Sequence, residues 1–168
     1  FSKLLNAYVD TNIGMPPIEI MIISSILKKS HEVHYTRNLN SKEIENCDFV
    51  ILQSSIIAHE TELQALSELK HKKIFVTGIF ATIMKDKYLN ENSIVVKNES
   101  DTFFYNLEIT NNLNFNFLNN LFDKKDLIND FYSPVLLDDL PYPDWKSYTK
   151  KFPLRNNFFS VNQKIAVP

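Results

Sequence analysis

The chain has 168 residues, of which 44% are hydrophobic, and its 18 Lys and Arg nearly balance its 20 Asp and Glu. This length allows one sizeable core with a small appendage. The net charge of −2 argues against a nucleic-acid-binding surface, for which a basic domain is expected. The most apolar stretch, 18–27, is too short to span a bilayer and contains Glu19, so no membrane segment is expected.

The glycine and cysteine counts exclude further classes of protein. Gly14 and Gly78 are the only glycines, so the Gly-rich phosphate loops of the P-loop and GxGxxG kinds are absent. Cys47 is the only cysteine, which rules out an internal disulfide or a cysteine-built metal cluster and fits a reducing compartment. With no evident signal peptide we expect a cytoplasmic protein, and a start at Phe1 instead of Met indicates a piece of a longer one.

Short apolar runs alternate with helical patterns from residue 1 to about 109. The run 3–9 (KLLNAYV) predicts a buried strand, and 16–30 predicts a helix with prolines at its start and lysines at its end. The alternating stretch 32–37 predicts a second strand, and a short helix is expected over 41–46.

The same alternation continues through the next segments. An unbroken apolar run, DFVILQSS (48–55), is typical of a central parallel strand. After it the pattern predicts a helix over 59–71, a strand over 73–78, a helix over 81–90, a strand over 93–97 and a helix over 100–109. Strands that alternate with helices predict a doubly wound, flavodoxin-like α/β domain over 1–109, with a five-stranded parallel sheet of order 2-1-3-4-5. Ligands of such sheets bind outside the carboxyl ends of the strands.

After residue 109 the pattern changes. Residues 114–122 and 127–137 predict two short strands joined by a turn, so we expect a β-hairpin appendage over 110–137. In the last segment, 138–168, two prolines bracket Tyr142 just before Trp145, the only tryptophan. Since proline restricts its own backbone and that of its predecessor, we expect a stiff, aromatic linker here.

Residues that often carry chemistry form no complete catalytic pattern. His31 and His34 lie three residues apart in a predicted strand and point to opposite faces, so a metal site is not expected. Ser54 and Ser55 end a strand but lack the GxSxG turn of a hydrolase nucleophile, and Cys47 has no evident histidine base. We therefore expect neither a catalytic residue nor a metal ligand in this chain.

A phospho-receiver domain has the same predicted fold. Asp10, Thr77 and Lys97 stand at three of the places that a receiver needs, but the strand over 48–55 carries Gln53 and Ser54 near its end, so the phosphoacceptor aspartate is missing. A pseudo-receiver, or another flavodoxin-like binding module, stays open as an alternative.

Taken together, these segments resemble the N-terminal cobalamin-binding domain of the B12-dependent radical SAM proteins. That family has a loop ending in PP before a helix and then a GHEV-like strand, and this chain has GMPPIEIMIISSILKKSHEV (14–33). DFVILQSS (48–55), TGIFAT (77–82) and NESD (98–101) stand where the family has a D-[FV]-V strand, a GGPHAT strand end and a GEGE loop. The family's linker, LD-x-LP-[FY]-P, is matched closely by LDDLPYPDW (137–145), and the resemblance covers essentially the whole chain.

The resemblance implies a larger parent protein. In this family the linker leads into a radical SAM barrel, so 138–168 would connect this domain to a barrel encoded beyond Pro168. That barrel would hold a [4Fe-4S] cluster and S-adenosylmethionine, and methyl transfer is one reaction of the family. The expected partners are thus cobalamin and the barrel, and this chain alone is not expected to be catalytic.

The resemblance also implies which residues contact cobalamin. The loop 10–15 contains no histidine, so the cofactor is expected base-off, without a histidine ligand to its cobalt. The expected contacts lie in four loops: Thr11, Asn12, Ile13, Gly14 and Met15; Ser54, Ser55 and Ile56; Gly78, Ile79 and Phe80; and Asn98 and Glu99.

Four side chains in these loops differ from the family's pattern. Thr77, Asn98 and Ser100 replace glycines, and Phe80 replaces a histidine. Such side chains narrow the slot beside which the nucleotide tail of cobalamin is thought to lie. The alternative is therefore a degenerate domain that keeps the fold without cobalamin and serves as a structural or interaction domain for the barrel.

Overall fold

The computed structural model describes residues 17–97, 99–124 and 131–152. Its centre is a three-stranded parallel sheet in the order β1-β2-β3, formed by Phe49–Gln53, Lys73–Thr77 and Ser93–Val95. Phe49 pairs with Lys73 and Gln53 with Thr77, so β1 and β2 are paired along their whole length. The α/β class is confirmed, as is the parallel pairing of the strands predicted over 48–55, 73–78 and 93–97. The strand predicted over 3–9 lies outside the described residues.

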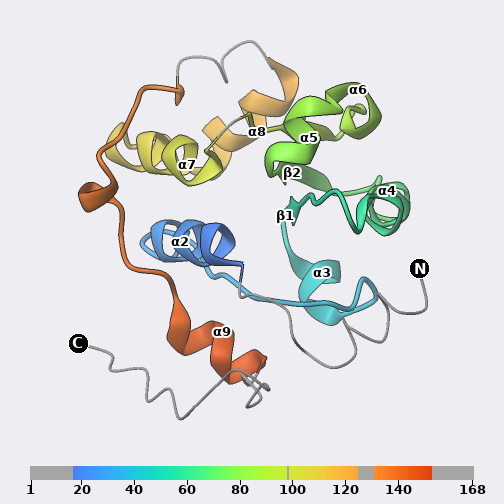
Figure 1. The fold of residues 1–168 in the computed structure, drawn as a ribbon, viewed down its shortest axis with the longest axis horizontal. Coiled ribbons are helices and arrows are strands. Elements are labelled where there is room, and N and C mark those ends of the chain that lie inside the picture. The colour runs from blue at the N-terminus through green and yellow to red at the C-terminus, as the bar shows by residue number, and fades with distance from the viewer. Residues whose placement is uncertain (1–16, 98, 125–130, 153–168) are drawn as a thin grey trace.

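Helices cover both faces of this sheet (Figure 1). One face carries α2 (Ile18–Leu27), α7 (Ser100–Ile109) and α8 (Phe115–Asp123), and the other carries α3 (Lys42–Asn46), α4 (His59–Glu68), α5 (Ile79–Ile83) and α6 (Lys85–Tyr88). Successive side chains of a strand point to opposite faces, and accordingly Phe75 packs into the first layer and Val76 into the second.

Aromatic rings fill the core beneath α7 and α8. The ring of Phe75 lies 6.4 Å from that of Phe103, 5.4 Å from Phe104 and 4.9 Å from Phe122, measured between centroids. Rings that meet edge to face at such distances stabilise a core beyond the area that they bury. The second core is smaller and gathers around the fully buried Tyr88, with Leu66 and Val76 among its members.

The predicted hairpin over 110–137 is wrong in its first strand, because 114–122 forms the helix α8. The alternating Phe115 and Phe117 resemble a strand, but Leu118, Leu121 and Phe122 follow helical spacing and are the buried residues. Asn114 caps the helix, since its side chain accepts a hydrogen bond from the Phe117 amide over 2.9 Å. Residues 131–137 contain no strand either, and 125–130 lie outside the described residues.

Two other predicted elements differ in detail. The helix predicted over 81–90 is instead two short helices, α5 and α6, interrupted at Met84, whose φ and ψ of −104° and 36° are not helical. The strand predicted over 32–37 has no ladder partner among the described residues and is not a strand there. The helices predicted over 16–30, 41–46, 59–71 and 100–109 are confirmed, with shorter bounds for the first three.

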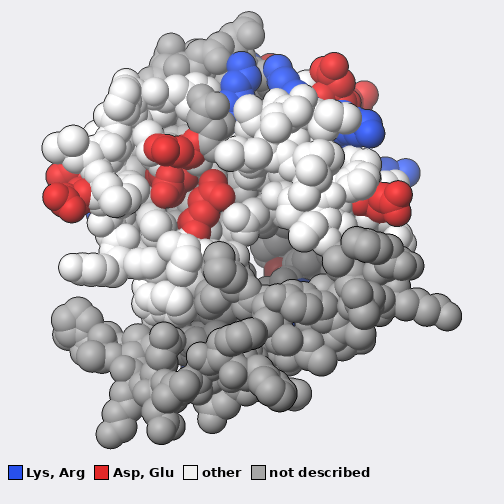
Figure 2. Space-filling view, viewed as in Figure 1, with Lys and Arg blue, Asp and Glu red and all other residues white. Residues whose placement is uncertain are grey.

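Charged side chains are unevenly distributed over the face that Figure 2 shows. Acidic side chains gather where α2 and α7 meet, and the surface over α5 is uncharged (Figures 1 and 2). None of the helices in the described ranges combines the length and apolar character that a bilayer crossing needs.

The segment after residue 130 returns across the first helical layer (Figure 1). Asn106 of α7 donates to the carbonyls of Phe131 and Ser133 over 2.9 and 2.8 Å, and the Lys97 amide donates to the Tyr132 hydroxyl over 2.9 Å. A short 3-10 turn, η2 (Leu137–Asp139), precedes the prolines, and the chain then enters α9 (Trp145–Lys151). The predicted linker is therefore docked on the sheet domain as far as it is described; 153–168 lie outside the described residues.

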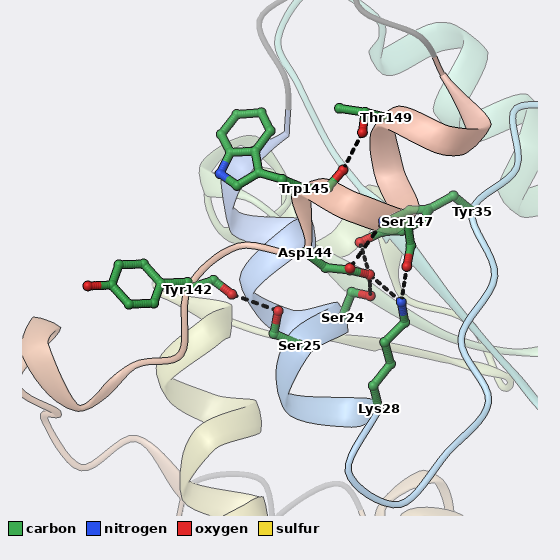
Figure 3. Close-up of polar contacts among 9 residues, drawn as sticks. All are labelled: Ser24, Ser25, Lys28, Tyr35, Tyr142, Asp144, Trp145, Ser147 and Thr149. Carbon is green, nitrogen blue, oxygen red and sulfur yellow. Dashed lines mark hydrogen bonds and ion pairs between the residues drawn. The ribbon is translucent and has the colours of Figure 1, made fainter. Parts of the chain in front are cut away.

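Asp144 fixes the linker to α2 (Figure 3). Its carboxylate forms an ion pair with Lys28. It also accepts hydrogen bonds from the Ser24 hydroxyl over 3.1 Å, and from the Tyr35 hydroxyl and the Ser147 amide over 3.3 Å each. Burial by itself raises the pKa of Asp144, but the hydrogen bonds from Lys28, Ser147 and Ser24 together lower it by more. The pKa therefore lies below its ordinary value. Burial also raises the pKa of Tyr35 to about 12, which keeps this donor protonated at neutral pH.

Backbone and aromatic contacts complete the docking. The Asp144 amide donates to the Met21 carbonyl over 3.0 Å, and Ser25 donates to the carbonyl of Tyr142 over 2.7 Å. Tyr148 of α9 is buried and meets Tyr35 edge to face at 5.5 Å, whereas Trp145 is only half-buried. The apolar seat of the linker thus belongs to Tyr148 and not to the tryptophan.

We expect Asp144→Asn to lower the free energy of unfolding by about 1–3 kcal/mol, because an ion pair and charge-assisted hydrogen bonds are lost from a side chain that is 11% exposed. The carboxylate contributes this stability above the unfolded-state pKa of about 3.9 and loses it as the pH falls through the lower folded-state pKa. Urea unfolding at neutral pH and below pH 4 measures both effects. Asp139→Asn, in the exposed η2, is the matched control; an equal effect of both substitutions would contradict this role of Asp144.

Candidate functional site

The loops that follow the strands open on the carboxyl edge of the sheet. Of the residues predicted to contact a ligand, Ser54, Ser55 and Ile56 follow β1, Gly78 begins the turn into α5, and Glu99 precedes α7. Ile79 and Phe80 are the first residues of α5. Thr11, Asn12, Ile13, Gly14, Met15 and Asn98 lie outside the described residues.

The ends of β1 and β2 are in direct contact. Gly78 has a φ of +98°, and a Cβ there would lie 2.6 Å from the Ser54 carbonyl oxygen, so only glycine fits. The Ser54 amide donates to the Thr77 carbonyl over 2.8 Å, and the Ser54 hydroxyl accepts from the Ala81 amide over 2.8 Å. The structure thus brings together Ser54 and Gly78, two of the residues predicted to contact cobalamin, and it uses the buried Ser54 side chain to hold α5 in place.

Glu62 is a buried carboxylate that the sequence reasoning missed. One oxygen accepts from the amide and the hydroxyl of Ser55, over 2.8 and 3.1 Å, and the other accepts from the Tyr88 hydroxyl over 2.9 Å. Burial and the neighbouring carboxylate raise the pKa of Tyr88 well above its ordinary value, so this hydroxyl stays a donor. Glu62 therefore ties the loop after β1 to α6. The only sign of its burial in the sequence was its position near Leu63 and Leu66, apolar residues of the predicted helix over 59–71.

Phe80 packs towards the second core. Its ring lies 5.3 Å from that of His59 at the start of α4 and 6.3 Å from that of Tyr88, between centroids. The loop after β1 and the helix after β2 therefore touch above the sheet. Phe80 acts as a spacer between α4 and α6, a role that its place in TGIFAT did not reveal.

The two segments that leave this contact carry four exposed isoleucines. Ile56 and Ile57 in the loop after β1 are 71% and 65% exposed, and Ile79 and Ile83 of α5 are 74% and 72% exposed. Ile79 and Ile83 lie one helical turn apart and share a face of α5. Since Ser54 contacts Gly78 and Ala81, the loop that carries Ile56 and Ile57 and the helix that carries Ile79 and Ile83 begin next to each other. The surface over α5 carries no charge (Figure 2). Large apolar side chains grouped on a surface mark interaction sites.

Acidic residues form the other side of the carboxyl edge. Glu19, in the first turn of α2, accepts from Gln53 at the end of β1 over 3.1 Å and from the amide and hydroxyl of Ser100 at the start of α7. Burial raises the pKa of Asp101, and Glu19 and Glu99 raise it further. Acidic side chains appear together where α2 and α7 meet (Figure 2). This side of the edge offers acceptors for a ligand that donates hydrogen bonds.

Thr77 lies between these two parts. It ends β2, pairs with Gln53 and is fully buried, and its hydroxyl has no hydrogen-bond partner among the described residues. Glu19 links the end of β1 to the start of α7, so it crosses above the end of the middle strand, where Thr77 stands. The side chain of Thr77 is thus enclosed at the end of the sheet and does not protrude from it.

The described residues hold no group of three or more His, Cys, Asp or Glu side chains that could bind a metal ion. Comparison of the chain with family models, with curated proteins and with solved structures finds no match. The resemblance to cobalamin-binding domains stays a prediction from the motifs, and the site itself must carry the functional argument.

We expect Glu62→Gln to lower the free energy of unfolding by about 1–3 kcal/mol, because an amide cannot accept from both Ser55 and Tyr88 with its two ends. Thermal unfolding followed by circular dichroism gives the difference. Glu60→Gln, on the exposed side of the same helix, is the control and should change little. Equal melting temperatures for Glu62→Gln and the wild type would show that the buried network is not needed.

Proposed function

We propose that this chain is the cobalamin-binding domain of a cytoplasmic, B12-dependent radical SAM enzyme, built on a five-stranded sheet of order 2-1-3-4-5. The observation that carries the proposal is the strong exposure of four isoleucines in the segments that follow β1 and β2, namely Ile56, Ile57, Ile79 and Ile83. The corrin ring of cobalamin is a broad, flat and largely apolar surface, and such a ligand suits a concave or flat apolar seat with polar groups at its rim. Ile56 and Ile79, both expected contacts, belong to this group.

The acidic side of the edge supports the same ligand. The corrin periphery carries primary amides, whose N–H groups donate hydrogen bonds, and carboxylates accept them. Glu99 is exposed and Asp101 is half-buried, so solvent reaches both carboxylates on the acidic side of the edge. The loop 10–15 would provide the remaining face of the corrin, without a histidine ligand to cobalt.

The chain's own residues would bind and orient the cofactor. Cobalamin, when bound, supplies the transferable group of the parent enzyme. Glu62 and Phe80 would keep the two loops beneath the corrin in fixed positions. The docked linker, with Asp144 on α2, would set how the barrel approaches this edge.

We expect the purified chain to retain hydroxocobalamin and methylcobalamin through gel filtration, with an absorbance spectrum that lacks histidine ligation. Ile79→Asp should weaken binding roughly tenfold to a hundredfold, because it removes about 1.5–3 kcal/mol of apolar burial and places a charge under the ring. Ile109→Asp is the matched control, since Ile109 is 55% exposed at the far end of α7. A wild-type chain that stays colourless at high ligand concentration would overturn the proposal for this isolated domain.

The second candidate is the same fold without cobalamin, serving as an interaction domain for the barrel. The close contact of Gly78 with the Ser54 carbonyl favours it, because the ends of β1 and β2 already pack directly against each other. The isoleucines would then be covered by protein.

Phe80→Gly discriminates between the candidates. If an obstructed slot is what limits binding, this variant retains more cobalamin per folded molecule than the wild type. Its melting temperature should fall, because the ring packs against His59 and Tyr88, so the folded fraction must be measured alongside. Unchanged retention would show that Phe80 does not block the cofactor.

A further inference from the structure

Three carboxylates at the carboxyl edge carry a charge that no ion pair of the described residues neutralises. Glu19 lies in the first turn of α2, Glu99 directly precedes α7, and Asp101 lies in the first turn of α7. None of the three takes part in an ion pair within the described ranges. Burial raises the pKa of Asp101, and Glu19 and Glu99 raise it further, so the three carboxylates lie close together. The edge therefore holds a local excess of negative charge.

Glu19 forms a bridge over the end of the middle strand. One carboxylate oxygen accepts a hydrogen bond from Gln53 at the end of β1 over 3.1 Å, and the other accepts from the amide and the hydroxyl of Ser100 at the start of α7. These donors are uncharged, and a carboxylate offers about four positions at which it can accept. The side chain of Glu19 is thus fixed by its neighbours, while its charge is not cancelled by them.

Thr77 points to the underside of this bridge. It pairs with Gln53 across parallel strands, so the two side chains lie on the same face of the sheet. Phe75, two residues earlier, packs on that face among residues of α2 and α7. Thr77 is fully buried, and its hydroxyl has no hydrogen-bond partner in the described part of the chain. Buried polar groups without a partner are uncommon in folded proteins, and a bound ligand is one explanation for them.

The helix starts explain only part of this arrangement. Acidic side chains are favourable in the first turn of a helix, where backbone amides have no partner within the helix, and this accounts for Glu19 and Asp101. It does not account for the buried hydroxyl of Thr77, which belongs to a strand beneath them. The carboxylates and the hydroxyl are therefore two independent observations at one place.

We propose that Glu19, Asp101 and Thr77 bind the primary ammonium group of a small amine. An ammonium group donates three hydrogen bonds and accepts none, and each of these side chains can accept one. Hydrogen bonds from an ammonium group to carboxylates are charge-assisted and therefore stronger than neutral ones. The described residues hold no group of three or more side chains suited to a metal ion, and an anion would be repelled by the carboxylates. This inference goes beyond the proposed function, because it requires no corrin ring.

Methylammonium chloride, compared with tetramethylammonium chloride, tests the site. Both cations are monovalent, but only methylammonium has N–H groups to donate. A ligand of so few heavy atoms binds no more tightly than roughly the millimolar range, so each salt is titrated to about 200 mM at constant ionic strength. We expect methylammonium to raise the melting temperature of the full chain by about 2–4 °C more than tetramethylammonium does. Equal effects of the two cations would overturn the proposal.

Two substitutions assign the effect to these residues. Thr77→Val keeps the shape of the side chain and removes the hydroxyl, and Asp101→Asn removes a charge, so each should weaken methylammonium binding about threefold to tenfold. Without ligand, Thr77→Val should melt no lower than the wild type, because it removes a buried hydroxyl without a partner.

Asp86→Asn is the matched control, since Asp86 is an exposed acidic residue in the first turn of α6. Binding that is unchanged in both Thr77→Val and Asp101→Asn, or that is weakened as much in Asp86→Asn, would overturn the proposal. The titration contains no cobalamin, so its outcome and that of cofactor retention are separate results.

Discussion

The contact between the ends of β1 and β2 is the constraint on which the carboxyl edge depends. The positive φ of Gly78 turns the chain directly onto the Ser54 carbonyl, and the hydroxyl of Ser54 then receives the Ala81 amide. A side chain at residue 78 would have to displace backbone, which cannot yield as a flexible side chain does. From this point the loop after β1 and the helix α5 leave in fixed directions. The positions of the exposed isoleucines therefore depend on Gly78, one of the two glycines in the chain.

Two carboxylates extend this constraint to both layers of helices. Glu62 joins the loop after β1 to α6 on one side, and Glu19 joins β1 to the start of α7 on the other. Neither carboxylate has a cation among these partners; each is held by amide and hydroxyl donors. Carboxylates satisfied by neutral donors are tolerated in partly buried positions because their hydrogen bonds replace those to water. The edge is thus rigid beneath its surface, which suits a seat that must not change shape when a ligand docks.

The sequence predicted the parts of the fold that depend on unbroken periodicity. The strands over 48–55, 73–78 and 93–97 were predictable because each is an apolar run of strand length between polar segments. The helix α8 was not, since Phe115 and Phe117 alternate like a strand and the deciding residues, Leu118 and Leu121, come only afterwards. For the site, the sequence indicated only which loops lie at the carboxyl edge. The hydrogen bond between the Ser54 hydroxyl and the Ala81 amide, and the one between Glu62 and the Ser55 amide, depend on tertiary contacts that no local pattern encodes.

The docked linker adds a condition on how this domain can be used. Asp144 both caps α9 and accepts from Ser24 of α2 and from Lys28 just after it, so one carboxylate holds the start of α9 to the C-terminal part of α2. Tyr148 adds an edge-to-face contact with Tyr35, and Lys151 at the end of α9 pairs with Glu43 of α3. The pKa of Glu43 is lowered to about 2, chiefly by its bond from Lys151, so this second tie also persists at neutral pH. A segment fixed at both ends in this way cannot swing freely. The chain therefore leaves α9 from a position that its contacts with α2 and α3 determine.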